Sequence, residues 1–208
     1  SAKYGRSDGG YSTDGPPSAW CTKPCGPDNN DDGIFADLAE LKFAIDNCVT
    51  KVASGLDCCK PVSEGGGGAD CASGGHSAVG EWDVSQVTSM DQLFRYSSFN
   101  QNISGWNTGK VTSMSGMFWG ATGNPEIGGF DTSKVTNMYA MFYEARSFNQ
   151  PIGNWDTSKV TSMQAMFSRA SAFNQPIGNW DVSQASMSTM FQNAVAFDQY
   201  IGDWASPA

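Results

Sequence analysis

The sequence predicts an α/β repeat fold, a solenoid of five coils in which each coil of about 24 residues contributes a short strand and a short helix. Three observations support this prediction. The second half of the chain repeats itself at a fixed period, each unit shows helical apolar spacing, and an amphipathic helix precedes the repeats. We expect an irregular arm over residues 1–33, a capping helix and disulfide-pinned loop over 34–81, and the repeat solenoid over 82–208.

The period is marked by one aromatic position in each unit. The units begin at Trp82, Trp106, Phe130, Trp155 and Trp180, with a truncated sixth at Trp204. The steps between them are 24, 24, 25, 25 and 24 residues, and residues 148–155 and 173–180 are identical in sequence. Such self-similarity is typical of stacked supersecondary units that bury a core only together.

The apolar residues within each unit follow a helical spacing. In the fourth unit Val160, Met163, Met166 and Phe167 fall at i, i+3, i+6 and i+7, which predicts one face of a short helix. Residues 152–155 then supply one extended rung per turn. Because the same positions are apolar in every unit, we expect a core of Met, Phe and Trp rather than a cofactor pocket.

A Phe-Asn-Gln tripeptide recurs near the end of the units and predicts a ladder of stacked amides. Such a ladder would satisfy backbone groups of loops that are otherwise buried without partners. The second unit has Gly123-Asn124-Pro125 at this place. We therefore expect both the amide ladder and the Phe stack to be interrupted there.

The segment that precedes the repeats contains one amphipathic helix. Its apolar face is made by Ile34, Leu38, Leu41, Ile45 and Val49. Their spacings of four, three, four and four place them on one side of a helix. Asp32 is the expected N-cap residue.

The six cysteines all lie before residue 72, namely Cys21, Cys25, Cys48, Cys58, Cys59 and Cys71. An even set in a loop-rich segment predicts disulfides formed in an oxidising, extracytoplasmic compartment, with the pairing left open. Zinc is the rival interpretation, although the spacing is not that of paired Cys-x2-Cys sites. Asp28, Asn30 and Asp32 match the start of an EF-hand calcium loop, but Ala39 replaces the twelfth ligand. An acidic turn is the alternative, so we expect no metal and no cofactor.

Composition and charge exclude several classes of partner. Twelve basic against 21 acidic residues leave a net charge of −9, without the basic patch that nucleic acid requires. No apolar run approaches the roughly 20 residues of a membrane-spanning helix. The first residues, Ser-Ala-Lys-Tyr, resemble a mature chain whose targeting segment has been removed, and an expression boundary would look the same.

The motifs Trp-Asp-x-Ser-x-Val-Thr-x-Met-x-x-Met-Phe and Phe-Asn-Gln-x-Ile resemble the BspA-type repeat family of leucine-rich-repeat-like surface proteins. That family is known from bacterial surface lipoproteins and from microbial eukaryotes, including algae. The resemblance covers residues 82–204. It implies a right-handed leucine-rich-repeat-like solenoid that serves in adhesion or protein binding and has no assigned catalytic residues.

The candidate contact residues lie where the units differ. Directly after the core Phe stand Arg95, Trp119 and Tyr143, and Tyr139 lies on the same part of the third unit. Exposed Trp, Tyr and Arg are typical of contact hot spots. In the alternative interpretation, Trp119 folds over the gap left by the missing Phe of its own unit. The repeats contain no His or Cys, so a catalytic triad would depend on His76 in a Gly/Ser run, and we expect no enzyme.

Three functions agree with these features. The first is a secreted, cell-surface or organelle-lumen scaffold or adhesion module that binds other proteins. The second is an extrinsic subunit of a large membrane-associated assembly, for example in an algal thylakoid lumen. The third is a carbohydrate-binding surface protein that uses Trp119, Tyr139 and Tyr143 as stacking platforms. Asn102-Ile103-Ser104 also forms a glycosylation sequon, which matters only in the secretory pathway.

Overall fold

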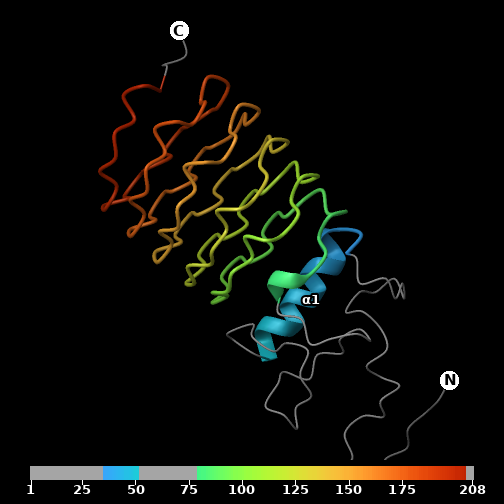
Figure 1. Ribbon diagram of the computed structural model, residues 1–208. Helices are drawn as coiled ribbons and strands as arrows, with labels where there is room; N and C mark the ends of the chain where they lie inside the picture. The colour runs from blue at the N-terminus through green and yellow to red at the C-terminus, as the bar shows by residue number, and fades with distance from the viewer. Residues whose placement is uncertain (1–34, 52–78, 205–208) are drawn as a thin grey trace, which may run out of the picture.

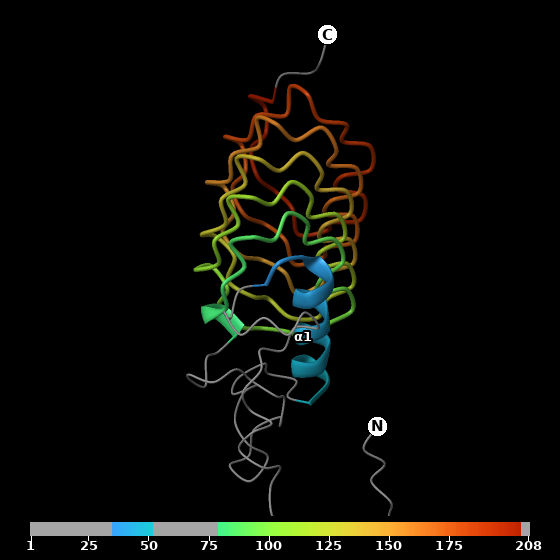
Figure 2. The ribbon, with the colours of Figure 1, turned by 90° about the vertical axis from the view of Figure 1, so that its right-hand side faces the viewer.

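The computed structural model describes residues 35–51 and 79–204, which form a stack of coils with a helix at one end. Helix α1 spans Leu38–Lys51, and the short 3-10 helix η3 spans Val79–Glu81. The coils comprise residues 82–105, 106–129, 130–154, 155–179 and 180–203, and they follow one another away from α1 (Figures 1 and 2). They form a compact repeat-like domain in which most of the secondary structure is irregular.

The predicted short helix of each coil is wrong, although its apolar face is right. The residues form successive turns, in which Met166 N–H donates to Met163 C=O and Ser168 N–H donates to Ala165 C=O, at 3.2 and 3.0 Å. Ala165 and Arg169 have φ of 55° and 62°, outside the helical region. These turns follow one another every two or three residues, and they direct Val, Met and Phe side chains inward much as a helix would. The spacing therefore did not distinguish the two conformations.

The predicted extended rung at residues 152–155 is also misplaced. Trp155 N–H donates to Ile152 C=O at 3.2 Å, which makes this segment a turn. The coils instead pair through isolated parallel bridges that link Ser89, Ser113, Asn137, Ser162 and Ser186 in succession. Within the described residues these bridges stand in place of regular strands.

Most backbone hydrogen bonds between the coils form four columns that run in one direction, while a fifth column, from Thr112 N to Thr88 O through to Ser186 N to Thr161 O, runs the opposite way. In each of the first four coils, four alternate N–H groups donate to carbonyls of the following coil. One column runs from Phe94 N to Met117 O, from Phe118 N to Met141 O, and onward through the Phe positions, at 2.8 to 2.9 Å. Two of the four donors in each coil have positive φ, and where these are not glycines this strained state persists because the neighbouring coils determine it.

Three columns of stacked aromatic rings fill the interior. Phe94, Phe118, Phe142, Phe167 and Phe191 form the first, with ring centroids 5.3 to 5.7 Å apart. The Trp positions form the second, at 6.3 to 6.5 Å from Trp106 to Trp180, and Phe148, Phe173 and Phe197 form the third. The methionines pack among these rings, so the prediction of a Met, Phe and Trp core is confirmed.

The second coil departs from the others less than its sequence suggested. The Phe stack is interrupted there as predicted, because Gly123 lies so close to the Phe99 carbonyl that no side chain would fit. The amide ladder, in contrast, continues. Asn124 N–H donates to the Asn100 side chain at 2.7 Å, and the Asn124 side chain accepts from Asn149 N–H at 2.8 Å. The predicted interruption of the ladder is therefore wrong.

Helix α1 begins later than predicted and closes the first coil. Its N-cap is Asp37 rather than Asp32, because Asp37 Oδ1 accepts the N–H groups of Ala39 and Glu40 at 2.7 and 3.0 Å. Glu40 Oε2 in turn accepts from the N–H of Ala36, the residue before the cap, at 2.8 Å. Leu41 and Ile45 are buried in the same cluster as the apolar residues of the first coil. The helix thus covers apolar surface that the first coil would otherwise expose.

Several predictions lie outside the described residues. The calcium candidates Asp28, Asn30 and Asp32 belong to this group, as does His76. The disulfide prediction also falls there, because no cysteine side chain is described, including that of Cys48 in α1.

Candidate binding surface

A ribbon of cationic and aromatic side chains crosses four coils on the surface. We call it the Arg-aromatic ribbon, and it consists of Arg95, Tyr96, Trp119, Tyr143 and Arg169. The Arg95 guanidinium lies 4.6 Å from the Trp119 ring centroid and 5.0 Å from that of Tyr96. Trp119 meets Tyr143 at 4.9 Å with tilted rings, and Arg169 lies 5.9 Å from the Tyr143 ring. Such cation–π contacts hold the charged groups in place.

The repeat itself positions these side chains. Arg95, Trp119 and Tyr143 each follow the core Phe of their coil, so the stacking of the coils brings them side by side. Tyr96 and Arg169 occupy the next position, where the backbone is left-handed with φ of 57° and 62°. The second coil has Gly120 there, and a side chain at Gly120 would strike the Tyr96 ring. Gly120 therefore leaves room for Tyr96 beside Arg95 and Trp119.

The ribbon carries an arginine at each end, and within the described residues one of the two is ion-paired. Arg169 Nη1 lies 2.7 Å from Glu144 Oε1. Arg95 instead donates from Nη1 to the Gln92 side chain at 2.9 Å and is exposed. Because a guanidinium has five N–H groups in a fork, Arg95 retains donors for an acceptor on a partner.

The structure brings together three of the four residues that the sequence singled out. Arg95, Trp119 and Tyr143 are in contact, whereas Tyr139 is 41 % exposed and has no ring contact among the described residues. Tyr96 and Arg169 were not among the residues predicted from the sequence. The sequence feature that could have indicated them is the pair Gly116 and Gly120, because glycine is unfavourable inside the predicted helix. In the structure these glycines occupy the two left-handed positions of the second coil.

Trp119 does not fill the place of the missing Phe. At the Phe position of the second coil, the backbone of Gly123 itself lies against Phe99, so little space is left there. The indole is half-buried between Arg95 of the first coil and Tyr143 of the third. Its environment is therefore that of the ribbon.

A row of aspartates lies on another turn of the coils. In each case the carboxylate accepts both the side-chain and the backbone hydrogen bond of the serine two residues later, and these bonds lower the pKa of Asp131, Asp156 and Asp181. For Asp156 the distances are 2.6 Å to Ser158 Oγ and 3.0 Å to Ser158 N. These carboxylates close turns, and a lowered pKa keeps them ionised rather than poised as acids or bases.

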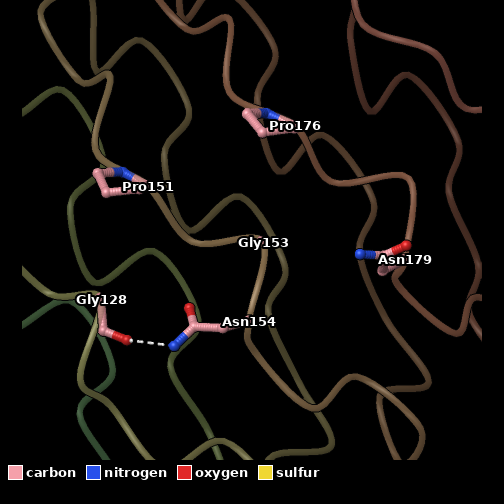
Figure 3. A pocket seen from close by; sticks show the side chains of 6 residues that line it. All are labelled: Gly128, Pro151, Gly153, Asn154, Pro176 and Asn179. Atoms are coloured by element: carbon pink, nitrogen blue, oxygen red, sulfur yellow. Dashed lines mark hydrogen bonds between the residues drawn. The ribbon is translucent and has the colours of Figure 1, made fainter.

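A shallow groove lies beside the turns of the second to fourth coils (Figure 3). Its lining residues are Gly128, Pro151, Gly153, Asn154, Pro176 and Asn179. Figure 3 shows the Asn154 side chain directed at the Gly128 carbonyl, to which its Nδ2 donates at 3.0 Å. The groove contains no titratable side chain, and its polar groups are amides and carbonyls.

The glycosylation sequon lies on the surface of the first coil. Asn102 is exposed, but its Nδ2 donates to Glu126 Oε2 at 2.7 Å and its Oδ1 accepts from Ser104. Its side chain thus links the first two coils.

Two further findings concern metals and membranes. Among the residues that the structure describes, no three His, Cys, Asp or Glu side chains gather as a metal site would require. In the same part of the chain, neither helix is long and apolar enough to cross a bilayer.

Comparison with known proteins identifies a family. The model of a family described as "Mycoplasma protein of unknown function, DUF285" matches residues 71–124 and again residues 121–208. The two matches together cover more than half of the chain. No curated protein and no solved structure matches it.

Proposed function

The chain belongs to the DUF285 family, whose repeats are the BspA-like, leucine-rich-repeat-like repeats of surface proteins, and from this premise we propose that it is a non-enzymatic protein-binding module. The observation that carries the proposal is the Arg-aromatic ribbon. We take the stack to be a right-handed leucine-rich-repeat-like solenoid that presents this ribbon in an extracytoplasmic, oxidising compartment.

The composition of the ribbon favours a protein partner. Tyr96 is 63 % exposed, and Trp, Tyr and Arg are the residues that most often dominate binding energy at protein interfaces. The side chains are held by one another before any partner arrives, which reduces the entropy lost on binding. A partner that offers carboxylate or carbonyl oxygens to Arg95 and an apolar side chain to Tyr96 would match this surface.

The geometry of Trp119 is less favourable for carbohydrate. A sugar stacks on an open aromatic face, but Arg95 lies over the indole from the first coil and Tyr143 packs against it from the third. Carbohydrate binding would require one of these contacts to open. We therefore favour protein over glycan, and a scaffold or adhesion role over stacking on sugars.

An extrinsic subunit of a larger assembly would use the same surface. The distinction between this role and that of a free adhesion module is one of stoichiometry. A subunit should leave its native source in a complex much larger than 22.2 kDa, whereas a free module should not. Size-exclusion chromatography of the untagged native chain separates these alternatives.

A photo-crosslinking experiment tests the ribbon itself. A photoreactive amino acid replaces Tyr96 in one chain and the exposed Lys159, on a different turn of the coil, in the matched control. In cells of the source organism, we expect the Tyr96 position to yield an adduct of defined mass that Trp119→Ala abolishes. An adduct that survives Trp119→Ala, or that forms equally well from position 159, would show that the ribbon is not part of the binding surface.

A further inference from the structure

The outer edge of the fifth coil carries a row of backbone N–H groups that all point the same way. In each of the first four coils, the N–H groups at four alternate positions donate to the next coil. The same positions in the fifth coil have no acceptor within the described residues, and they are Met187, Thr189, Phe191 and Asn193. Along these four positions the edge offers donors only, whereas an ordinary strand edge presents donors and acceptors in alternation, because the carbonyls between them already accept from the fourth coil.

Four columns of hydrogen bonds end here with their N–H groups outward, against one column of opposite direction, and together they make this edge electrically positive. Each peptide unit in a column accepts a hydrogen bond from one coil and donates one to the next. In the second coil, for example, the peptide unit between Met117 and Phe118 accepts at the Met117 C=O and donates from the Phe118 N–H. The peptide dipoles in each column are thus aligned, as they are in an α-helix, and their positive ends add up at the last N–H. Four such columns end side by side on the fifth coil.

An apolar hollow lies against the same edge and is an independent feature. Met187, Met190, Phe191, Ile201 and Trp204 line it, together with two polar residues, and its volume is about 500 Å³. Nearby, Val195 and Tyr200 are 81 % and 74 % exposed. The aromatic column that runs through Phe167 ends at Phe191, so this hollow is where the next apolar layer would pack.

We propose that this edge is a docking site for an extended peptide segment of a partner, which adds to the stack as a further coil. The segment would present backbone carbonyls from alternate residues to the four N–H groups and place Met or Phe side chains in the hollow. The row of donors and the aligned dipoles require a row of acceptors, and the hollow requires apolar side chains.

The same polarity argues against a second copy of this chain. Two fifth coils that meet edge to edge would oppose donors to donors. In a head-to-tail arrangement the fifth coil would have to meet the carbonyl side of a first coil, and α1 lies at that end (Figures 1 and 2). The proposal does not depend on the Arg-aromatic ribbon, because the two sites share no residue.

Hydrogen exchange of the full chain with a peptide probe tests the proposal. The probe is a peptide with the sequence of residues 155–179, whose carbonyls at positions 162, 164, 166 and 168 accept these bonds within the stack. We expect saturable protection, with exchange of the four edge amides slowed by about tenfold or more. A scrambled peptide of the same composition is the control and should give no protection.

Two variants assign the protection to the site. Trp204→Ala combined with Met187→Asp should abolish it, while unchanged exchange in the first three coils shows that the stack is intact. Arg95→Ala, which alters only the ribbon, should leave it unchanged. The proposal fails if the four amides exchange equally fast with and without the probe. It also fails if the wild-type chain dimerises and the double variant does not, because the occupant would then be a second copy.

Discussion

The two ends of the stack differ in what covers them. At the N-terminal end, Phe35 N–H donates to Asp83 C=O at 3.1 Å, its ring packs on Trp82, and α1 buries the surface of the first coil. At the other end, Phe191 and Trp204 remain half-exposed. The same repeat position is thus 1 % exposed at Phe94 and partly open at Phe191. In this fold the burial of a residue depends on its neighbouring coil as much as on its own sequence.

Truncating the equivalent Phe at each end of the stack should give the largest difference in stability between the two ends. We expect Phe94→Ala to lower the free energy of unfolding by about 3 to 5 kcal/mol, because it removes a fully buried ring from the aromatic column. Phe191→Ala should cost less than half as much, since part of that ring already contacts water. Urea unfolding followed by tryptophan fluorescence measures both. Equal losses would mean that the cover at the N-terminal end contributes nothing.

Removing a contact of α1 should have the next largest effect. Leu41 is fully buried between the helix and the first coil, so we expect Leu41→Ala to cost about 2 to 4 kcal/mol. Leu38→Ala is the matched control on the same helix, and it should cost less because Leu38 is only half-buried. If Leu41→Ala leaves the urea midpoint unchanged, α1 is not part of the cooperative unit.

The amide ladder permits a third comparison between an internal coil and the open end. Asn149 Oδ1 accepts from Asn174 N–H at 2.9 Å, so Asn149→Ala should cost about 1 to 3 kcal/mol. Asp198 stands at the same position of the fifth coil, and its carboxylate has no partner within the described residues. Asp198→Ala should therefore change stability little.

Asn149→Asp is the control for this pair. It keeps the acceptor oxygen and should retain most of the stability measured by urea unfolding. If Asn149→Asp is as destabilising as Asn149→Ala, the loss would come from packing and not from the hydrogen bond.

The sequence predicted the repeat, its five coils and its core, because each of these follows from which residues recur. It did not predict the backbone. Met163, Met166 and Phe167 point inward in a helix and also in successive turns, and the pattern alone does not choose between them. The choice is made by hydrogen bonds to the neighbouring coil, which hold even Glu144 and Arg169 in left-handed conformations.

The candidate surface, like the fold, was predictable from the sequence only in part. Arg95, Trp119 and Tyr143 were found because they share one repeat position. Tyr96 and Arg169 were missed because their orientation follows from the positive φ that the predicted helix did not include. The row of N–H donors on the fifth coil depends entirely on this backbone conformation, so no pattern of side chains in the sequence predicts it.

Acidification should lower the free energy of unfolding equally for variants at the two ends of the stack. This effect should be smaller than that of any destabilising substitution above, and it tests whether electrostatics contributes to the difference between the ends. Hydrogen bonds from Ser133, Ser158 and Ser183 lower the pKa of Asp131, Asp156 and Asp181 below the ordinary value of 3.8. The unfolded chain then binds protons first as pH falls, so the stabilisation is complete above that value and is lost as pH falls through the lowered pKa. The carboxylates are exposed, so the loss should be small. Urea midpoints measured from pH 5 to pH 2 should fall in parallel for Phe94→Ala and Phe191→Ala, and less steeply for Asp156→Asn. A gap between the two Phe variants that changes with pH would show that electrostatics, and not burial alone, distinguishes the ends.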